Sequence, residues 1–145
     1  MKLVWLVDDD VNIREAMEAM VSMIGYSFRG FPDARDATRV LLDGERPDLL
    51  LLDINMPEVT GMDLLKFIRS REQWNTLPIL MLTSESSDES VEKAVRLGAD
   101  GYVFKPVNFE ELQIAVRTGL EKRRLKTGPL NSISPPTRPI RRKDS

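Results

Sequence analysis

The chain has 145 residues, of which 41% are hydrophobic and 30% charged, a composition typical of one globular domain with a short extension. It contains neither cysteine nor histidine, which excludes disulfide frameworks, thiolate nucleophiles, imidazole catalysis and the usual zinc sites. A functional site must therefore consist of carboxylates, hydroxyls, amides, lysine and arginine. We expect a metal bound by such groups to be a hard, oxygen-preferring cation such as magnesium.

The formal net charge of −2 is unevenly distributed along the chain. Residues 125–145 contain five basic side chains and one acidic side chain, so residues 1–124 carry a net charge of −6. An acidic body argues against direct binding of nucleic acid by that part of the chain. No apolar run approaches the roughly 20 residues that span a bilayer, and the amino terminus lacks the pattern of a signal peptide. We expect a cytoplasmic protein without a membrane partner.

Five short apolar runs, in chain order, predict β-strands at Leu3–Val7, Tyr26–Phe31, Leu49–Leu52, Ile79–Leu82 and Tyr102–Phe104. The first, third and fourth runs are almost wholly apolar, which is typical of strands buried on both faces of a parallel sheet. The second and fifth are shorter or interrupted, so we expect them at the edges of the sheet.

Helical periodicity fills the segments between these runs. The apolar stripes cover Ile13–Ile24, Ala34–Leu41, Leu64–Ile68, Val91–Gly98 and Leu112–Leu120. Two pairs with the spacing of a capping box predict helix starts, namely Ser86 with Glu89 and Asn108 with Glu111. Three glycines predict helix ends, namely Gly25, Gly44 and Gly98.

Strand and helix alternate five times, which predicts an α/β fold with helices on both faces of a parallel sheet. Right-handed crossovers leave a doubly wound, five-stranded (βα)5 sheet of order 2-1-3-4-5 as the natural topology, similar to flavodoxin. We predict one domain over residues 1–124. Residues 125–145 are rich in proline and basic side chains and predict a flexible tail or the start of a linker.

Polar residues gather where the predicted strands end. Asp8, Asp9 and Asp10 follow the first strand, and Asp53 follows the third, its expected neighbour. Crowded carboxylates repel one another, and a divalent cation relieves that repulsion. A helix N-cap is the alternative for these acids, and it suits Asp10 best.

The fourth and fifth strands end in Thr83 and Lys105, at the same edge of the sheet. Asp53, next to a metal and a cation, can act as a nucleophile that accepts a phosphoryl group. Lys105 and Thr83 can then contact the phosphoryl oxygens. Each residue also has a simpler interpretation: a turn cap for Asp53, a solvated surface lysine for Lys105, and a polar strand end for Thr83.

The joint pattern resembles the receiver domain of bacterial two-component response regulators, over residues 1 to about 122. The motifs that carry the resemblance are Val7-Asp8-Asp9-Asp10, Leu52-Asp53-Ile54-Asn55-Met56-Pro57 with Gly61, Thr83-Ser84, Gly98-Ala99-Asp100 and Lys105-Pro106.

The resemblance implies a role for each residue of the site. Asp53 matches the phosphoacceptor, and Lys105 matches the phosphate-binding lysine. Asp8 and Asp9 match the acidic pair that holds Mg²⁺ together with Asp53, and Asn55 matches the position whose backbone carbonyl completes the protein ligands. Mn²⁺ is a possible substitute for Mg²⁺.

The resemblance also implies a switch. Thr83 matches the switch hydroxyl and Tyr102 the switch aromatic residue. Asn55 and Glu85 match positions that modulate the lifetime of the phosphoryl group. The Lys105–Pro106 peptide bond is typically cis in this family.

The function that follows is a phosphorylation-activated response regulator rather than a dedicated enzyme, one that takes part in its own Mg²⁺-dependent phosphotransfer and autodephosphorylation. A sensor histidine kinase or phosphotransfer protein supplies the phosphoryl group. The fourth helix, fifth strand and fifth helix, from Val91 through Tyr102 to about Leu120, then signal to a partner or support a phosphorylation-dependent homodimer. The alternative is a receiver fragment of a DNA-binding transcriptional regulator, in which residues 125–145 begin the linker.

Two enzyme or cofactor classes fit less well. Phosphatases of the haloacid dehalogenase class place their nucleophile on the first strand as Asp-x-Asp, whereas Asp53 is followed two residues later by Asn55. In a flavodoxin-like cofactor binder, the acids Asp8–Asp10 would repel the flavin phosphate.

Overall fold

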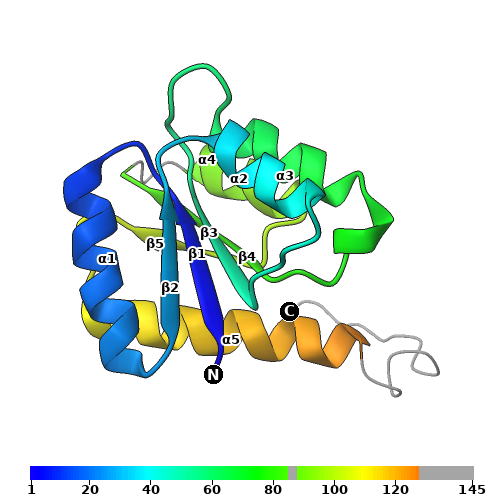
Figure 1. Ribbon diagram of the computed structural model, residues 1–145. Helices are drawn as coiled ribbons and strands as arrows, with labels where there is room; N and C mark the ends of the chain where they lie inside the picture. Colours follow the sequence, from blue (N-terminus) through cyan, green and yellow to red (C-terminus); the bar gives the residue numbers. More distant parts are fainter. Residues whose placement is uncertain (85–87, 128–145) are drawn as a thin grey trace.

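Five parallel strands form the centre of the molecule, in the order β2-β1-β3-β4-β5. The computed structural model describes residues 1–84 and 88–127 (Figure 1). The strands are β1 (Leu3–Val7), β2 (Ser27–Phe31), β3 (Leu49–Asp53), β4 (Ile79–Thr83) and β5 (Gly101–Phe104). The predicted fold class and strand order are therefore confirmed.

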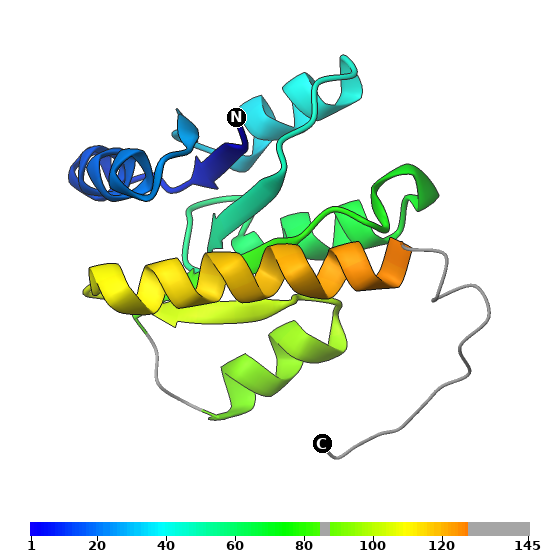
Figure 2. The ribbon, with the colours of Figure 1, turned by 90° about the horizontal axis from the view of Figure 1, so that it is seen from below.

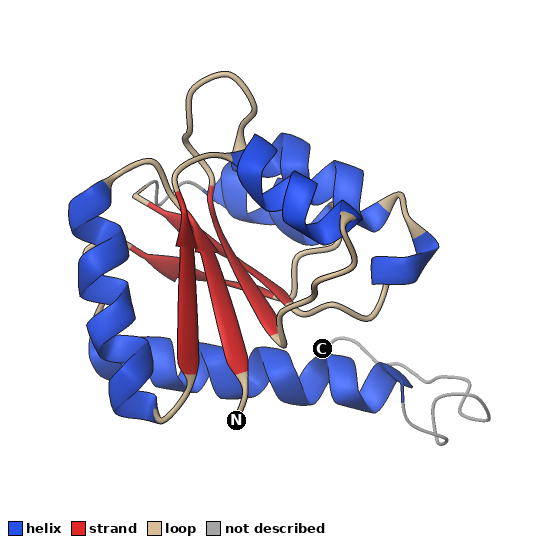
Figure 3. Ribbon diagram, in the orientation of Figure 1, coloured by secondary structure: helices blue, strands red, loops and turns tan. Residues whose placement is uncertain are grey.

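Helices cover both faces of this sheet (Figure 3). They are α1 (Val11–Ile24), α2 (Ala34–Leu42), α3 (Gly61–Arg69), α4 (Asp88–Arg96) and α5 (Phe109–Thr127), with a 3₁₀ turn η1 at Glu72–Trp74. The helices α1 and α5 lie on one face, and α2, α3 and α4 lie on the other (Figure 1). Among the described residues, no helix combines the length and the apolar character that crossing a membrane requires.

Two apolar layers result from the alternation of side chains along the strands. In β1, Trp5 and Val7 pack with α2, α3 and α4, whereas Val4 and Leu6 pack with α1 and α5. Every residue of β3 is buried. Each of the central strands has helices on both faces of the sheet, which explains why its sequence is continuously apolar. The edge strands β2 and β5 retain exposed residues, as predicted.

The helix boundaries follow local signals for the most part. Asp10 caps α1, because its carboxylate accepts from the backbone N–H groups of Asn12 and Ile13. At the end of α1, Gly25 adopts φ +103°, the left-handed conformation that glycine tolerates best. Asn108 accepts from the N–H of Glu111, as the cap pattern predicted. The Ser86 cap lies outside the described residues.

Two elements differ from the sequence prediction. The turn η1 was missed, because three residues are too few to show a period. The helix α5 continues to Thr127, past the predicted apolar stripe, which ends at Leu120, and Figure 2 shows it in front of the sheet. The residues that follow Thr127 are Gly128 and Pro129, so the first helix-breaking pair coincides with the end of the helix. The assignment of the following residues to a tail or linker stays a prediction.

A buried ion pair joins α3 to the start of β5. Arg69 donates to the Asp100 carboxylate at 3.0 Å, and the two side chains are only 11% and 2% exposed. Arg69 also donates to the carbonyl oxygens of Gly98, Trp74 and Leu77. One guanidinium thus ties together several chain segments at the amino ends of the strands.

Candidate functional site

The carboxyl ends of β1 and β3 bring the predicted acids together. Val7 pairs with Leu52 across the two strands, so Asp8 and Asp53 follow at neighbouring positions. Both side chains are buried, with 0% and 3% of their residue surface exposed, whereas Asp9 is exposed. One carboxylate oxygen from each of Asp8, Asp9 and Asp53 lies within 4.8 Å of the others. The predicted cluster therefore forms, at the predicted edge of the sheet.

Lys105 lies between the two buried acids. Its Nζ is 3.0 Å from Asp8 Oδ2 and 3.3 Å from Asp53 Oδ1. Burial alone would lower the pKa of Lys105, but the close contacts with Asp8 and Asp53 and their negative charges outweigh it and raise this pKa above its usual value. The simpler interpretation of Lys105 as a solvated surface lysine is wrong. The Lys105–Pro106 bond is cis.

The same crowding acts on Asp53. Burial first, and then the negative charge of Asp8, raise the pKa of Asp53 to about 6 against the opposing effect of Lys105. A carboxylate in this position is costly to ionise without additional positive charge. The site therefore favours a second cation beside Lys105.

A divalent metal fits this donor set. Asp8 Oδ2 is buried and forms an ion pair with Lys105. Within the described part of the chain, no donor has hydrogen-bond geometry toward this oxygen. A buried carboxylate oxygen that lacks such a donor, close to two further carboxylates, matches the all-oxygen ligands that Mg²⁺ prefers. Asp8, Asp9 and Asp53 are thus the residues able to hold the metal.

The remaining predicted residues lie around this centre. The N–H of Asn55 approaches Asp53 Oδ1 at 3.4 Å, which places Asn55 in the loop directly after the acid. Thr83 is fully buried at the end of β4, and its carbonyl oxygen accepts from the N–H of Lys105 at 2.8 Å. Their proposed roles stay predictions.

Tyr102 is set apart from the acids. Its side chain is 43% exposed, and its ring meets Phe104 edge-on, with 5.2 Å between centroids. In this arrangement Tyr102 contributes to the outer surface of β5. Glu85, predicted as a modulating residue, lies outside the described residues.

Gly61 begins α3 directly under the backbone of Asp53. Its N–H donates to the carbonyl oxygen of Ile54 at 3.1 Å. A Cβ at this position would collide with the carbonyl oxygen of Asp53 and lie 3.0 Å from the Cα of Ile54. Gly61 therefore permits the close approach that supports the loop after Asp53. The sequence motif contained this glycine, but its reason appears only in the fold.

We expect Gly61→Ala to destabilise the protein by about 1–3 kcal/mol. The new Cβ would meet backbone atoms of Asp53 and Ile54, and neither this backbone nor the start of α3 can move away without strain. Urea unfolding measures this change. The matched control is Gly119→Ala on α5, where the new Cβ meets only the side chains of Leu80 and Leu49. Equal stabilities of the two variants would contradict the prediction.

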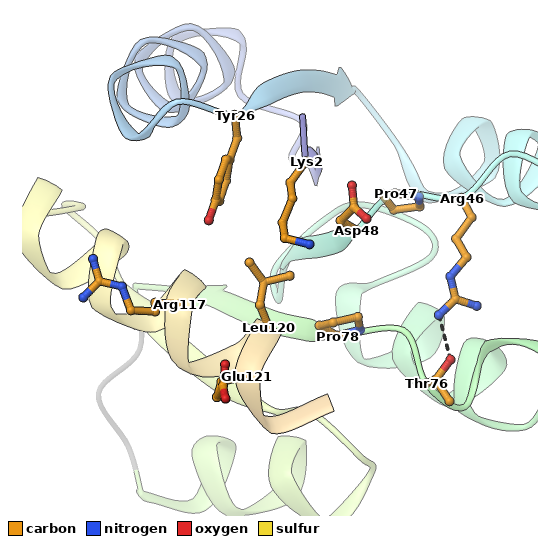
Figure 4. Close-up of a pocket in the computed structure, with 10 residues that line it drawn as sticks. All are labelled: Lys2, Tyr26, Arg46, Pro47, Asp48, Thr76, Pro78, Arg117, Leu120 and Glu121. Atoms are coloured by element: carbon orange, nitrogen blue, oxygen red, sulfur yellow. Dashed lines mark hydrogen bonds between the residues drawn. The ribbon is translucent and has the colours of Figure 1, made fainter. Parts of the chain in front are cut away.

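A cavity of about 480 Å³ lies elsewhere, near the amino ends of the strands (Figure 4). It is lined by residues from several segments: Lys2, Tyr26, Arg46, Pro47, Asp48, Thr76, Pro78, Arg117, Leu120 and Glu121. None of the predicted site residues is among them. The chemistry of the carboxylate cluster is therefore independent of this cavity.

Two curated proteins resemble this chain in sequence over most of its length. Over 129 residues it is 36% identical to the DNA-binding transcriptional regulator NtrC of Proteus hauseri, covering 89% of this chain and 27% of the relative. It is 31% identical over 134 residues to the phosphate regulon regulatory protein PhoB of Pseudomonas aeruginosa, covering 92% and 56%. The chain thus spans between about a quarter and about half the length of these curated relatives.

A solved structure matches over almost its whole length. The chemotaxis response regulator CheY4 of Vibrio cholerae is 34% identical, with a TM-score of 0.75, and the match covers 82% of this chain and 98% of that one. The family model of the response regulator receiver domain matches residues 4–117. With its strand order, its carboxylate cluster and this match, the chain belongs to the family of response regulator receiver domains.

Proposed function

We propose that this chain is a phosphorylation-activated switch whose phosphoacceptor is Asp53. The observation that carries the proposal is the convergence of Asp8, Asp9, Asp53 and Lys105 at one edge of the sheet. As in the family of receiver domains, the proposed phosphoryl donor is a phosphohistidine. Because this chain has no histidine, that group belongs to another protein, a sensor histidine kinase or phosphotransfer protein. A cytoplasmic location is part of the same proposal.

Each residue contributes a separate part of the chemistry. An Asp53 oxygen attacks the phosphorus, the bond from phosphorus to the histidine nitrogen breaks, and an acyl phosphate forms on Asp53. Lys105 holds one phosphoryl oxygen by charge, and the Thr83 hydroxyl donates to another. Asp8, Asp9, Asp53 and the Asn55 carbonyl would hold Mg²⁺, or Mn²⁺ as a substitute, and the bound metal would neutralise phosphoryl charge.

The cycle ends by hydrolysis of the acyl phosphate. Water attacks the phosphorus, the bond from phosphorus to the Asp53 oxygen breaks, and inorganic phosphate leaves. Asp53 regains its carboxylate, so the chain resets itself without being a dedicated enzyme. The resemblance makes Asn55, in the loop directly after Asp53, and Glu85 the residues proposed to modulate the rate of this step.

The output surface consists of α4, β5 and α5. Apolar side chains are exposed there at Val95, Tyr102, Phe104 and Ile114. Contact of the phosphoryl group with Thr83 shifts the population of conformations that this surface adopts, and Tyr102 changes its packing with it. The surface then binds a downstream partner or a second phosphorylated copy.

A second candidate is the receiver of a DNA-binding transcriptional regulator. The relatives that favour it are NtrC and PhoB, of whose lengths the chain covers only 27% and 56%. In that case residues 125–145 begin the linker to the effector domain, and the acidic body does not itself bind DNA. A reading frame that continues beyond residue 145 and encodes a DNA-binding domain distinguishes this candidate from a single-domain regulator.

The proposal is tested by incubating the chain with acetyl phosphate and Mg²⁺ and measuring its intact mass. We expect addition of a single phosphoryl group, dependent on the metal and abolished in Asp53→Asn. The matched control is Asp10→Asn, since asparagine also caps helices and Asp10 is the acid that serves α1. Undiminished labelling of Asp53→Asn would overturn the assignment.

A further inference from the structure

Arg14 on α1 reaches back to the metal-binding loop. Its Nη1 donates to the backbone carbonyl oxygen of Asp8 at 2.6 Å, in a partly buried position. This carbonyl belongs to the peptide that joins Asp8 to Asp9, the two acids of the loop. We propose that Arg14 is a positioning residue for the metal site, which rests on the metal-dependent function proposed above.

The loop from Asp8 to Asp10 is held on each side of Asp9. The N–H of Asp8 donates to the carbonyl oxygen of Phe31 at 3.0 Å, and the N–H of Asp10 donates to Asp8 Oδ1 at 2.9 Å. Arg14 holds the carbonyl of Asp8, and its own N–H donates to the carbonyl of Asp10 at 3.1 Å. The guanidinium of Arg14 thus restrains the carbonyl of Asp8, whereas the bond to Asp10 is the first backbone bond of α1 and does not depend on the side chain. The exposed Asp9 lies between these two residues.

The edge strand leaves room for this side chain. A Cβ on Gly30 of β2 would lie 3.1 Å from the Cδ of Arg14 and 3.3 Å from a ring carbon of Phe28. Because Gly30 has no side chain, the Arg14 stem can lie against β2 on its way to Asp8. This packing restrains the guanidinium, so less side-chain freedom is lost when the hydrogen bond forms.

An electrostatic role and a positioning role of Arg14 predict opposite effects on metal affinity. A cation near three carboxylates repels a divalent metal, so a purely electrostatic role means that Arg14 weakens metal binding. A positioning role means that Arg14 strengthens it, because the guanidinium fixes the peptide from which the ligands project. Hydrogen bonding to the backbone carbonyl, rather than to a carboxylate, favours the positioning role.

The experiment measures Mg²⁺ affinity by calorimetry in the full chain and in the variants Arg14→Lys and Arg14→Met. Both variants lose the planar donor, but only the second loses the charge. We expect the Kd for Mg²⁺ to increase about tenfold in both, as is typical when a group that supports metal ligands is removed. The matched control is Arg117→Met, which removes the same charge beside the cavity of Figure 4, and we expect it to leave the Kd unchanged.

Circular dichroism and urea unfolding in chelator confirm that each variant is folded before the titration. The Arg14→Lys variant also keeps most of the aliphatic stem that packs near Gly30, so its packing against β2 changes least. An Arg14→Met variant that binds Mg²⁺ as tightly as the unmodified chain, or more tightly, would overturn the positioning role and leave the proposed function intact. Failure of the unmodified chain to bind Mg²⁺ would overturn the proposed function itself.

Discussion

Replacing Arg69 by methionine is expected to lower the free energy of unfolding by about 3–5 kcal/mol, because it leaves the buried Asp100 carboxylate without its cation. Three carbonyl oxygens, those of Gly98, Trp74 and Leu77, lose a donor as well. The N–H of Ile79 would continue to donate to the Asp100 carboxylate. Urea unfolding at neutral pH measures the loss.

The control for this prediction is Arg39→Met on α2. Arg39 pairs with Asp36 at 3.1 Å, but both side chains are well exposed, so we expect a change below about 1 kcal/mol. A second substitution, Asp100→Asn, should recover part of the loss in the Arg69→Met background, since it removes the buried negative charge. An Arg69→Met variant no less stable than Arg39→Met would show that the buried network contributes nothing.

Asp53→Asn is expected to stabilise the metal-free protein at neutral pH while abolishing its phosphorylation. Burial, and then the charge of Asp8, raise the folded-state pKa of Asp53 to about 6 from an ordinary value of 3.8. Below the ordinary value, Asp53 is protonated in both the folded and the unfolded chain and has no effect. As the pH rises, the unfolded chain loses this proton first, so stability falls until the pH exceeds about 6.

The size of this effect follows from the shift in pKa. Complete loss of the proton costs on the order of 2–3 kcal/mol, and asparagine avoids that cost because it does not ionise. Lys105 keeps a partner in the variant, because Asp8 Oδ2 remains 3.0 Å away. We therefore expect Asp53→Asn to exceed the unmodified chain in stability at about pH 7.5 and to match it near pH 4.

Urea unfolding in chelator at both pH values tests this prediction. Addition of Mg²⁺ is expected to stabilise the unmodified chain more than the variant, since the metal binds the native state and the variant has lost one carboxylate ligand. A stability difference that is the same at both pH values would show that ionisation of Asp53 is not its cause.

Local patterns predicted most of the architecture of this protein. The apolar runs at Leu3–Val7, Leu49–Leu52 and Ile79–Leu82 became the three central strands, because a doubly covered strand excludes polar side chains along its whole length. The predicted order of the strands then brought Asp8 and Asp53 together, although they are far apart in the sequence.

The sequence patterns gave no indication of the contacts that two arginines make inside the fold. Arg14 and Arg69 occupy helices, where an arginine ordinarily extends into solvent. Their partners are mainly backbone carbonyls, which every residue possesses and which therefore leave no signal in the sequence. A contact of this kind becomes visible only when both segments have their places in the fold.

By itself, the sequence determined the fold class, the strand order and the set of carboxylates available to a metal, because each depends on periodicity or on the end of a strand. Only the tertiary structure decided how those acids differ. Asp9 is exposed, whereas Asp8 and Asp53 share Lys105 in a buried site. The physical reason is that burial and the proximity of charges, which set the pKa of a carboxyl group, arise from neighbours distant along the chain.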